Sequence, residues 1–228
     1  MILLFAAALA AAAPAQSQCP DLVTSDAFLC KALAASKSGQ PDIAAVAFEQ
    51  AAEAQTDNEA EKARAWAAAG NMWIAANQPG KAAVDLDRAL ASPELQAEQR
   101  GEALLDRARA AEAQNDLKTA RAKVGEAAQT IAQDPFLWYF SAALAIREND
   151  AATAKSAIGK ALSLEPNNPT ILFEAGHVYH FAGEESAART YWSRAAAADA
   201  NGKSGQAAKQ ALELLDRPNV QTEAPPSK

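Results

Sequence analysis

The feature that most constrains the fold is an alternation of large and small apolar residues at helical spacing. Trp66, Gly70 and Trp73 lie at i, i+4 and i+7, so they share one face of a helix. Small residues then flank Leu86 in the same register, which predicts a second helix. A glycine at a crossing lets two helix backbones approach closely, and a neighbouring ring fills the volume beside it. The pattern therefore predicts a tightly packed pair of helices.

This pattern returns along most of the chain. It is clearest in 135–168 and in 169–202, two units that are 34 residues apart. The residues that define it are Trp138, Ala142, Ala154, Ile158, Ala161 and Pro166 in the first of these units, and Gly176, Tyr179, Gly183, Ala188, Trp192 and Ala195 in the second. One unit alone leaves an apolar face in water, and stacking several units buries that face. A fixed period of this length predicts a stacked array of helix pairs rather than a single globular core.

These residues resemble the tetratricopeptide repeat family, whose units have an early Trp, a small residue four positions later, and alanines and a proline at fixed later positions. The resemblance implies an all-α fold, a right-handed α-solenoid of about five tetratricopeptide-like helix-turn-helix repeats with a C-terminal capping helix. The repeats are assigned to 25–58, 63–96, 101–134, 135–168 and 169–202. The first two steps are 38 residues long, so about four extra residues lie near Asn58–Glu61 and near Leu95–Glu98, in lengthened turns or helix ends.

The two ends of the array have their own signals. Residues 203–217 read as an amphipathic helix, which a terminal repeat needs to cover its exposed core, and Pro218 stops it. The tail, 218–228, is polar and proline-rich, so we expect it to be disordered. Residues 1–15 have the short apolar core and small-residue cleavage pattern of a secretory signal peptide, although no Lys or Arg precedes the core. We expect residues 16–24 to form an extended lead-in.

Export decides how the cysteines are interpreted. Cys19 and Cys30 are the only two cysteines, and an even count in an exported protein favours a disulfide over free thiols. The alternative is that Cys30 is a small core residue and Cys19 is exposed. About 14 apolar residues at the N-terminus are too few to span a hydrocarbon core of ~30 Å. We therefore expect an exported, periplasmic protein with no integral membrane segment in the mature chain.

The sequence offers little for catalysis. It contains neither a glycine-rich phosphate loop nor a nucleophile elbow. His177 and His180, with Glu174 one turn before them, form at best a weak metal site, because zinc needs further ligands. We expect no enzyme activity, no cofactor and no bound metal. A net charge of −7 and a pI near 5.0 also argue against nucleic-acid binding.

The remaining candidate is the concave surface that the resemblance implies. In this family the first helix of each unit lines an inner groove. The groove residues are those that follow each packing residue by one position. The predicted partner-binding groove contains Asn71, Ile74, Leu105, Arg109, Tyr139, Ile146, Phe173, His177 and His180, with Arg147 at its edge. The family's basic clamp for a peptide carboxylate is not matched, because Ala67 rather than Lys precedes Asn71 by one turn. An aromatic patch that stacking does not use is typical of a partner site, and the alternative is packing against the capping helix or a neighbouring copy.

These observations favour a non-catalytic protein-protein interaction scaffold or adaptor. It would bind peptide or protein partners in the bacterial cell envelope through the concave groove. One alternative is a structural subunit of an envelope or secretion complex. Another is an accessory subunit of an exported enzyme, with the histidines near its site.

If residues 1–15 are a signal peptide, the mature chain begins at or near Gln16 and leaves the cytoplasm. Intact-mass measurement on fractionated cells checks both points, with a cytoplasmic marker protein as the control for leakage. A soluble chain that still carries Met1 would contradict the prediction.

Overall fold

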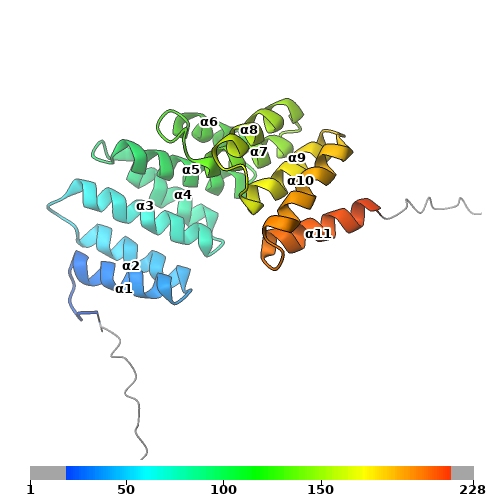
Figure 1. Cartoon of the computed structure of the whole chain (residues 1–228). Coiled ribbons are helices and arrows are strands. Elements are labelled where there is room, and N and C mark those ends of the chain that lie inside the picture. Colours follow the sequence, from blue (N-terminus) through cyan, green and yellow to red (C-terminus); the bar gives the residue numbers. More distant parts are fainter. Residues whose placement is uncertain (1–18, 217–228) are drawn as a thin grey trace, which may run out of the picture.

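The computed structural model describes residues 19–216, so the predicted signal peptide and tail lie outside the described residues. Every regular element in the described range is an α-helix. The helices are α1 (Ser25–Lys37), α2 (Pro41–Ala54), α3 (Glu59–Ala75), α4 (Pro79–Ala91), α5 (Ala97–Ala113), α6 (Leu117–Ala127), α7 (Pro135–Arg147), α8 (Ala151–Leu164), α9 (Pro169–Phe181), α10 (Glu185–Ala198) and α11 (Lys203–Asp216). They pack in adjacent antiparallel pairs, which is the α-solenoid that the repeat pattern predicts (Figure 1).

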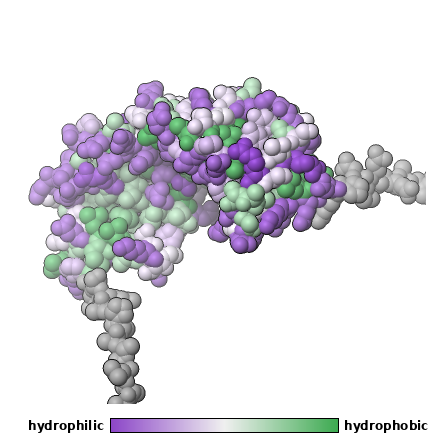
Figure 2. Space-filling view, in the orientation of Figure 1, coloured by the Kyte–Doolittle hydropathy of each residue, from purple (hydrophilic) through white to green (hydrophobic). Residues whose placement is uncertain are grey.

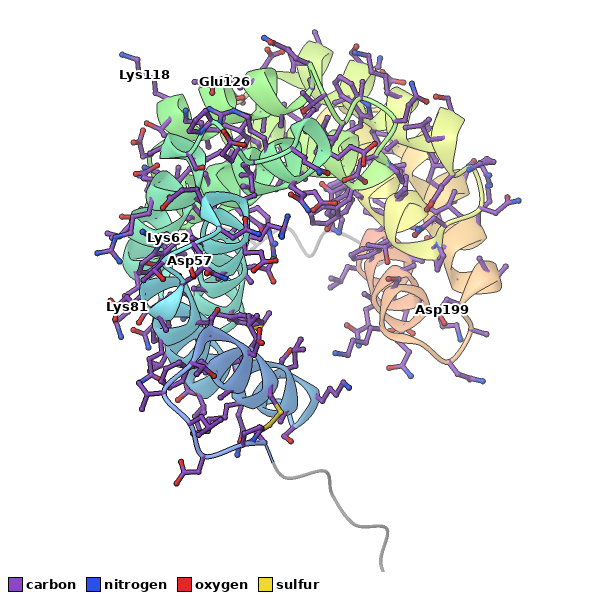
Figure 3. All side chains as sticks on the ribbon, turned by 90° about the vertical axis from the view of Figure 1, so that its left-hand side faces the viewer. Asp57, Lys62, Lys81, Lys118, Glu126 and Asp199 are labelled. Atoms are coloured by element: carbon purple, nitrogen blue, oxygen red, sulfur yellow. A yellow bond between two sulfur atoms is a disulfide. The ribbon has the colours of Figure 1, made fainter. Side chains whose placement is uncertain are left out.

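The odd-numbered helices also contact one another from pair to pair. Helix α3 packs on α5, α7 on α9, and α9 on α11, so these helices lie side by side along one layer. Turned through 90°, the array is an open arc with α1 at one tip and α11 at the other (Figure 3). The labelled Lys118 of α6 points away from the inside of this arc.

The turn inside each of the first five pairs contains one residue with a left-handed backbone. These residues are Gly39, Asn77, Asn115, Asn149 and Gly183, with φ between 56° and 75°. Glycine and asparagine tolerate this conformation better than other residues, and it ends the first helix of each pair. Along the chain they are separated by 38, 38, 34 and 34 residues, so the same turn recurs at the steps that the sequence pattern indicates.

The extra residues of the longer steps are helical. Helices α3 and α5 have 17 residues each, whereas α1, α7 and α9 have 13. Four residues correspond to about one additional turn. At α3 this turn begins directly after Asn58, whose side chain accepts a hydrogen bond from the backbone N–H of Glu61 at 3.1 Å. The N-cap therefore places the added turn at the start of the helix.

The helices of a pair meet where glycine faces a large side chain. A Cβ atom at Gly176 would overlap the indole ring of Trp192, which is 3% exposed. A Cβ atom at Gly70 would overlap the fully buried Leu86. These contacts join α9 to α10 and α3 to α4, so the backbones come close only because the side chain is absent.

A carboxyl group is buried beside the second pair. Asp85 of α4 is 2% exposed and accepts a hydrogen bond from Arg88 at 3.2 Å. The indole N–H of Trp73 donates to Glu49 of α2 at 2.7 Å. Burial, followed by the nearby Glu49 carboxyl, raises the pKa of Asp85 well above its ordinary range. The protonated form of this group is therefore the one that suits the folded state.

The N-terminal lead-in is tied to the first helix. Cys19 and Cys30 form a disulfide with a Cα–Cα distance of 5.6 Å, as the sequence predicts. Lys31 of α1 also contacts Asp21 at 3.4 Å. The bridge holds the lead-in against α1, the first helix of the described residues.

We predict that Gly176→Ala lowers the free energy of unfolding by about 1–3 kcal/mol, because the added methyl group collides with the rigid, buried Trp192 ring. The matched control is Gly159→Ala in α8, where a Cβ atom would meet no other atom within 4 Å. That change should be neutral or stabilising by up to about 1 kcal/mol. Urea denaturation measures both, and equal behaviour of the two variants would refute the close crossing.

Candidate functional site: the concave face

A depression on the odd-numbered helices lies near the start of the array. It has a volume of about 340 Å³ and lies between α1, α3 and α5. We call it the N-terminal hollow. Its lining residues are Ser36, Phe48, Arg64, Ala67, Ala68, Asn71, Met72, Leu95, Gln99, Glu102, Ala103 and Asp106. An apolar floor with a polar rim is the usual composition of a binding pocket.

A hydrogen-bonded trio fixes one wall of the hollow. The Asn71 amide of α3 donates to one Asp106 oxygen at 2.7 Å, and Arg109 donates to the other at 2.7 Å. Both donors are partly buried, which strengthens such contacts relative to exposed ones. The trio links α3 to α5 and keeps the Asp106 carboxylate satisfied within the chain.

An aromatic segment continues the same surface toward the C-terminus. We use this name for Phe136 and Tyr139 of α7 together with Phe173, His177 and His180 of α9. The Phe136 and Tyr139 rings stack at 5.4 Å, and the Phe173 and His177 rings meet edge-on at 4.5 Å. Phe136 is 41% exposed. The segment therefore offers aromatic surface that is not fully used inside the protein.

Burial changes the acid–base behaviour of this segment. Burial, and then the neighbouring His180, lowers the pKa of His177, so its neutral form is favoured. Burial raises the pKa of Glu174 to about 7. Burial and the charge of Glu174 raise the pKa of Tyr139. Burial therefore favours the neutral forms of Glu174, His177 and Tyr139.

The described residues provide neither a metal centre nor a membrane span. Within 19–216, no group of three or more His, Cys, Asp or Glu side chains is arranged to hold a metal ion. His180 instead contacts Glu185 at 3.0 Å. No helix in this range combines the length and the apolar character needed to cross a bilayer.

The residues predicted for the groove have different surroundings in the structure. Asn71, Arg109, Tyr139, Phe173 and His177 are partly exposed, and His180 is exposed. Ile74 and Ile146 are partly buried and pack against the core. Arg147 is held by hydrogen bonds to the Glu112 carbonyl and the Asn115 side chain, each at 2.9 Å.

Leu105 does not belong to the accessible surface. It is 4% exposed and lies in the core cluster with Leu137 and Phe140 of α7. Its assignment to the groove is therefore wrong. Leu105 follows a packing residue by one position, but the next helix pair covers this position and keeps it from solvent.

The polar rim of the hollow was not predicted from the sequence. Arg64, Gln99, Glu102 and Asp106 line it but lie outside the positions one step from the packing stripe. Asn71 bonds Asp106 and Arg147 bonds Glu112, both across 35 residues and both between neighbouring odd-numbered helices. The first pair crosses a repeat step of 38 residues and the second a step of 34, so no single offset from the repeat period would have found both.

Comparison with known proteins identifies the fold. No protein-family model matches the sequence, and no curated protein matches it. Solved structures do match. The structure of PilW, a widely conserved type IV pilus biogenesis factor, superposes with a TM-score of 0.69 at 19% identity, covering 82% of this chain and 83% of that one.

Two further structures agree. PilF of Pseudomonas aeruginosa gives a TM-score of 0.66 at 14% identity and covers 84% of this chain and 83% of its own. The structure of YrrB, a TPR protein with an unusual peptide-binding site, gives a TM-score of 0.58 at 17% identity. This match covers 81% of the present chain and 91% of YrrB. At these identities the similarity defines the architecture. The chain has the fold of tetratricopeptide-repeat proteins.

We predict that Glu174→Gln makes the protein more stable at pH 8 and leaves it nearly unchanged at pH 4. The folded-state pKa is about 7 and the unfolded value is about 4.3, so the stability that protonated Glu174 contributes is full below the unfolded pKa, falls as pH rises from about 4.3 to about 7, and is lost above the folded pKa. The gain at pH 8 should be on the order of 1–3 kcal/mol.

Urea denaturation at the two pH values measures this gain. Glu53→Gln, an exposed carboxyl on α2, is the control and should show no such difference. The buried Asp85 contributes equally to all three proteins. Parallel pH profiles for wild type and Glu174→Gln would contradict the prediction.

Proposed function

We propose that this protein is a non-catalytic scaffold or adaptor that binds peptide or protein partners along its concave face. The observation that supports the proposal most is the continuous, incompletely covered surface formed by the N-terminal hollow and the aromatic segment. Tyr139, Phe173 and His177 remain partly exposed although two of them also pack against the core, and aromatic residues in such positions are frequent energetic anchors of interfaces. YrrB, which has this architecture, is described as having a peptide-binding site, and this supports the proposal.

The cell envelope is the proposed location. The signal-peptide pattern of 1–15 supports it, and so does the Cys19–Cys30 disulfide, because such bonds persist in oxidising compartments. PilW, described as a pilus biogenesis factor, is a structural neighbour that fits this setting. The proposed organisation has the lead-in at 16–24, the five repeats over 25–202, a capping helix at 203–217 and the tail at 218–228.

A structural subunit of an envelope complex is the second candidate. It is favoured by large apolar side chains that are exposed near the start of the array. Ile43 and Val46 of α2 are 53% and 42% exposed, and Val84 of α4 is 52% exposed. Figure 2 shows apolar surface gathered at this end of the molecule. An outer apolar surface of this kind would suit permanent assembly rather than binding in the groove.

The double change Tyr139→Ala and Phe173→Ala should weaken partner binding by about 2 kcal/mol or more, because both rings leave the concave face. The measurement is quantitative affinity capture from envelope extract, followed by titration of the captured partner. Circular dichroism verifies that helicity is retained.

A matched double change on the outer surface, Ile43→Ala and Val84→Ala, separates the two candidates. Under the adaptor function it leaves binding within about twofold of wild type. Loss of the partner with the outer pair alone would instead favour the structural subunit. A Tyr139/Phe173 variant that unfolds would show that those rings belong to the core.

A further inference from the structure

The N-terminal hollow has a defined charge pattern. Arg64 is neutralised by Glu61 of the same helix at 3.7 Å. Asp106 is neutralised by Arg109 at 2.7 Å. Glu102 of α5 is exposed and takes part in none of the ion pairs found among residues 19–216. The charge that the hollow leaves for a partner is therefore negative.

An unsatisfied acceptor lies beside that carboxylate. The Gln99 side-chain oxygen is shielded from solvent and has no hydrogen-bond partner within the described part of the chain. Gln99 and Glu102 are three residues apart on α5, so they lie on the same face of the helix. Gln99 lines the hollow, so turning its amide group over brings this oxygen to a ligand that supplies a donor.

The floor of the hollow is apolar and favours an apolar group of the ligand. Phe48 and Leu95 are 8% and 4% exposed, and Met72 is partly buried against them. A volume of about 340 Å³ is at the small end of ligand pockets, which suits one or two side chains rather than a folded domain. Methionine in such a floor adapts to side chains of different shape.

We propose that the N-terminal hollow binds a peptide segment with an apolar side chain on its floor and a Lys or Arg side chain at Glu102. A backbone or side-chain N–H of the same segment donates to Gln99. This inference rests on the proposed peptide-binding function of the concave face, and it specifies the chemistry of the partner. Acidic segments are disfavoured because the uncompensated rim charge repels them.

Selection from a displayed library of random peptides tests the inference on the full mature chain. Enriched peptides should carry Lys or Arg next to Leu, Met or Phe. One enriched peptide, labelled with fluorescein, is then titrated by anisotropy against wild type and variants. Glu102→Arg should weaken its binding about tenfold or more, and higher salt should weaken the wild-type interaction.

Two further variants sharpen the test. Glu53→Arg makes the same change of net charge on the exposed surface of α2 and should leave the Kd within about twofold. Ala67→Phe fills the hollow from α3 and should abolish binding while circular dichroism stays unchanged.

The outcomes separate the inference from the function on which it rests. Enrichment of acidic or uncharged peptides, or an unchanged Kd in Glu102→Arg or Ala67→Phe, would overturn the inference and leave a peptide-binding adaptor. Absence of any enriched peptide would count against peptide binding by the concave face itself, and the inference would fall with it.

Discussion

Close approach of two helix backbones is the constraint on which this structure depends. Gly176 and Gly70 lie directly under Trp192 and Leu86, and both large side chains are almost completely buried. A methyl group at either glycine would separate the pair, because a packed interior has no spare volume. The alanines that dominate the core serve the same purpose less strictly. The distance between layers, the curvature of the arc and the shape of its inner face all follow from these crossings.

The sequence predicted those features that depend only on contacts within one repeat and therefore recur in every repeat. Helix pairs could be predicted because the crossing residues recur, and the turns because Asn115 and its equivalents adopt a left-handed backbone. Interactions between repeats could not be derived this way. Leu105 was assigned to the groove although the next pair covers it, and the pairing of Arg107 with Asp87 at 2.8 Å joins residues 20 apart. Such contacts depend on the rotation between pairs, which periodicity does not specify.

The N-terminal hollow is linked to the departure from the regular period. The extra turn of α5 begins at Ala97, and Gln99 lies within it. Leu95, which forms part of the floor, lies in the segment just before that turn. The two longer steps therefore enlarge the inner face at the start of the array. The C-terminal pairs have shorter first helices and lack this enlargement. An irregularity that weakens the repeat pattern in the sequence is thus part of what shapes the candidate site.

Internal pairing also decides which side chains are free to act. Asp106 is held by Asn71 and Arg109, and Arg147 is held by the end of α5, so most groove charges already have partners. These contacts fix neighbouring odd-numbered helices and reduce the ordering that binding would otherwise require. Glu102 is left exposed, and the aromatic segment is left partly exposed. Because few groups remain unpaired, recognition rests on a small number of positions, which is why single substitutions on this face can distinguish one partner chemistry from another.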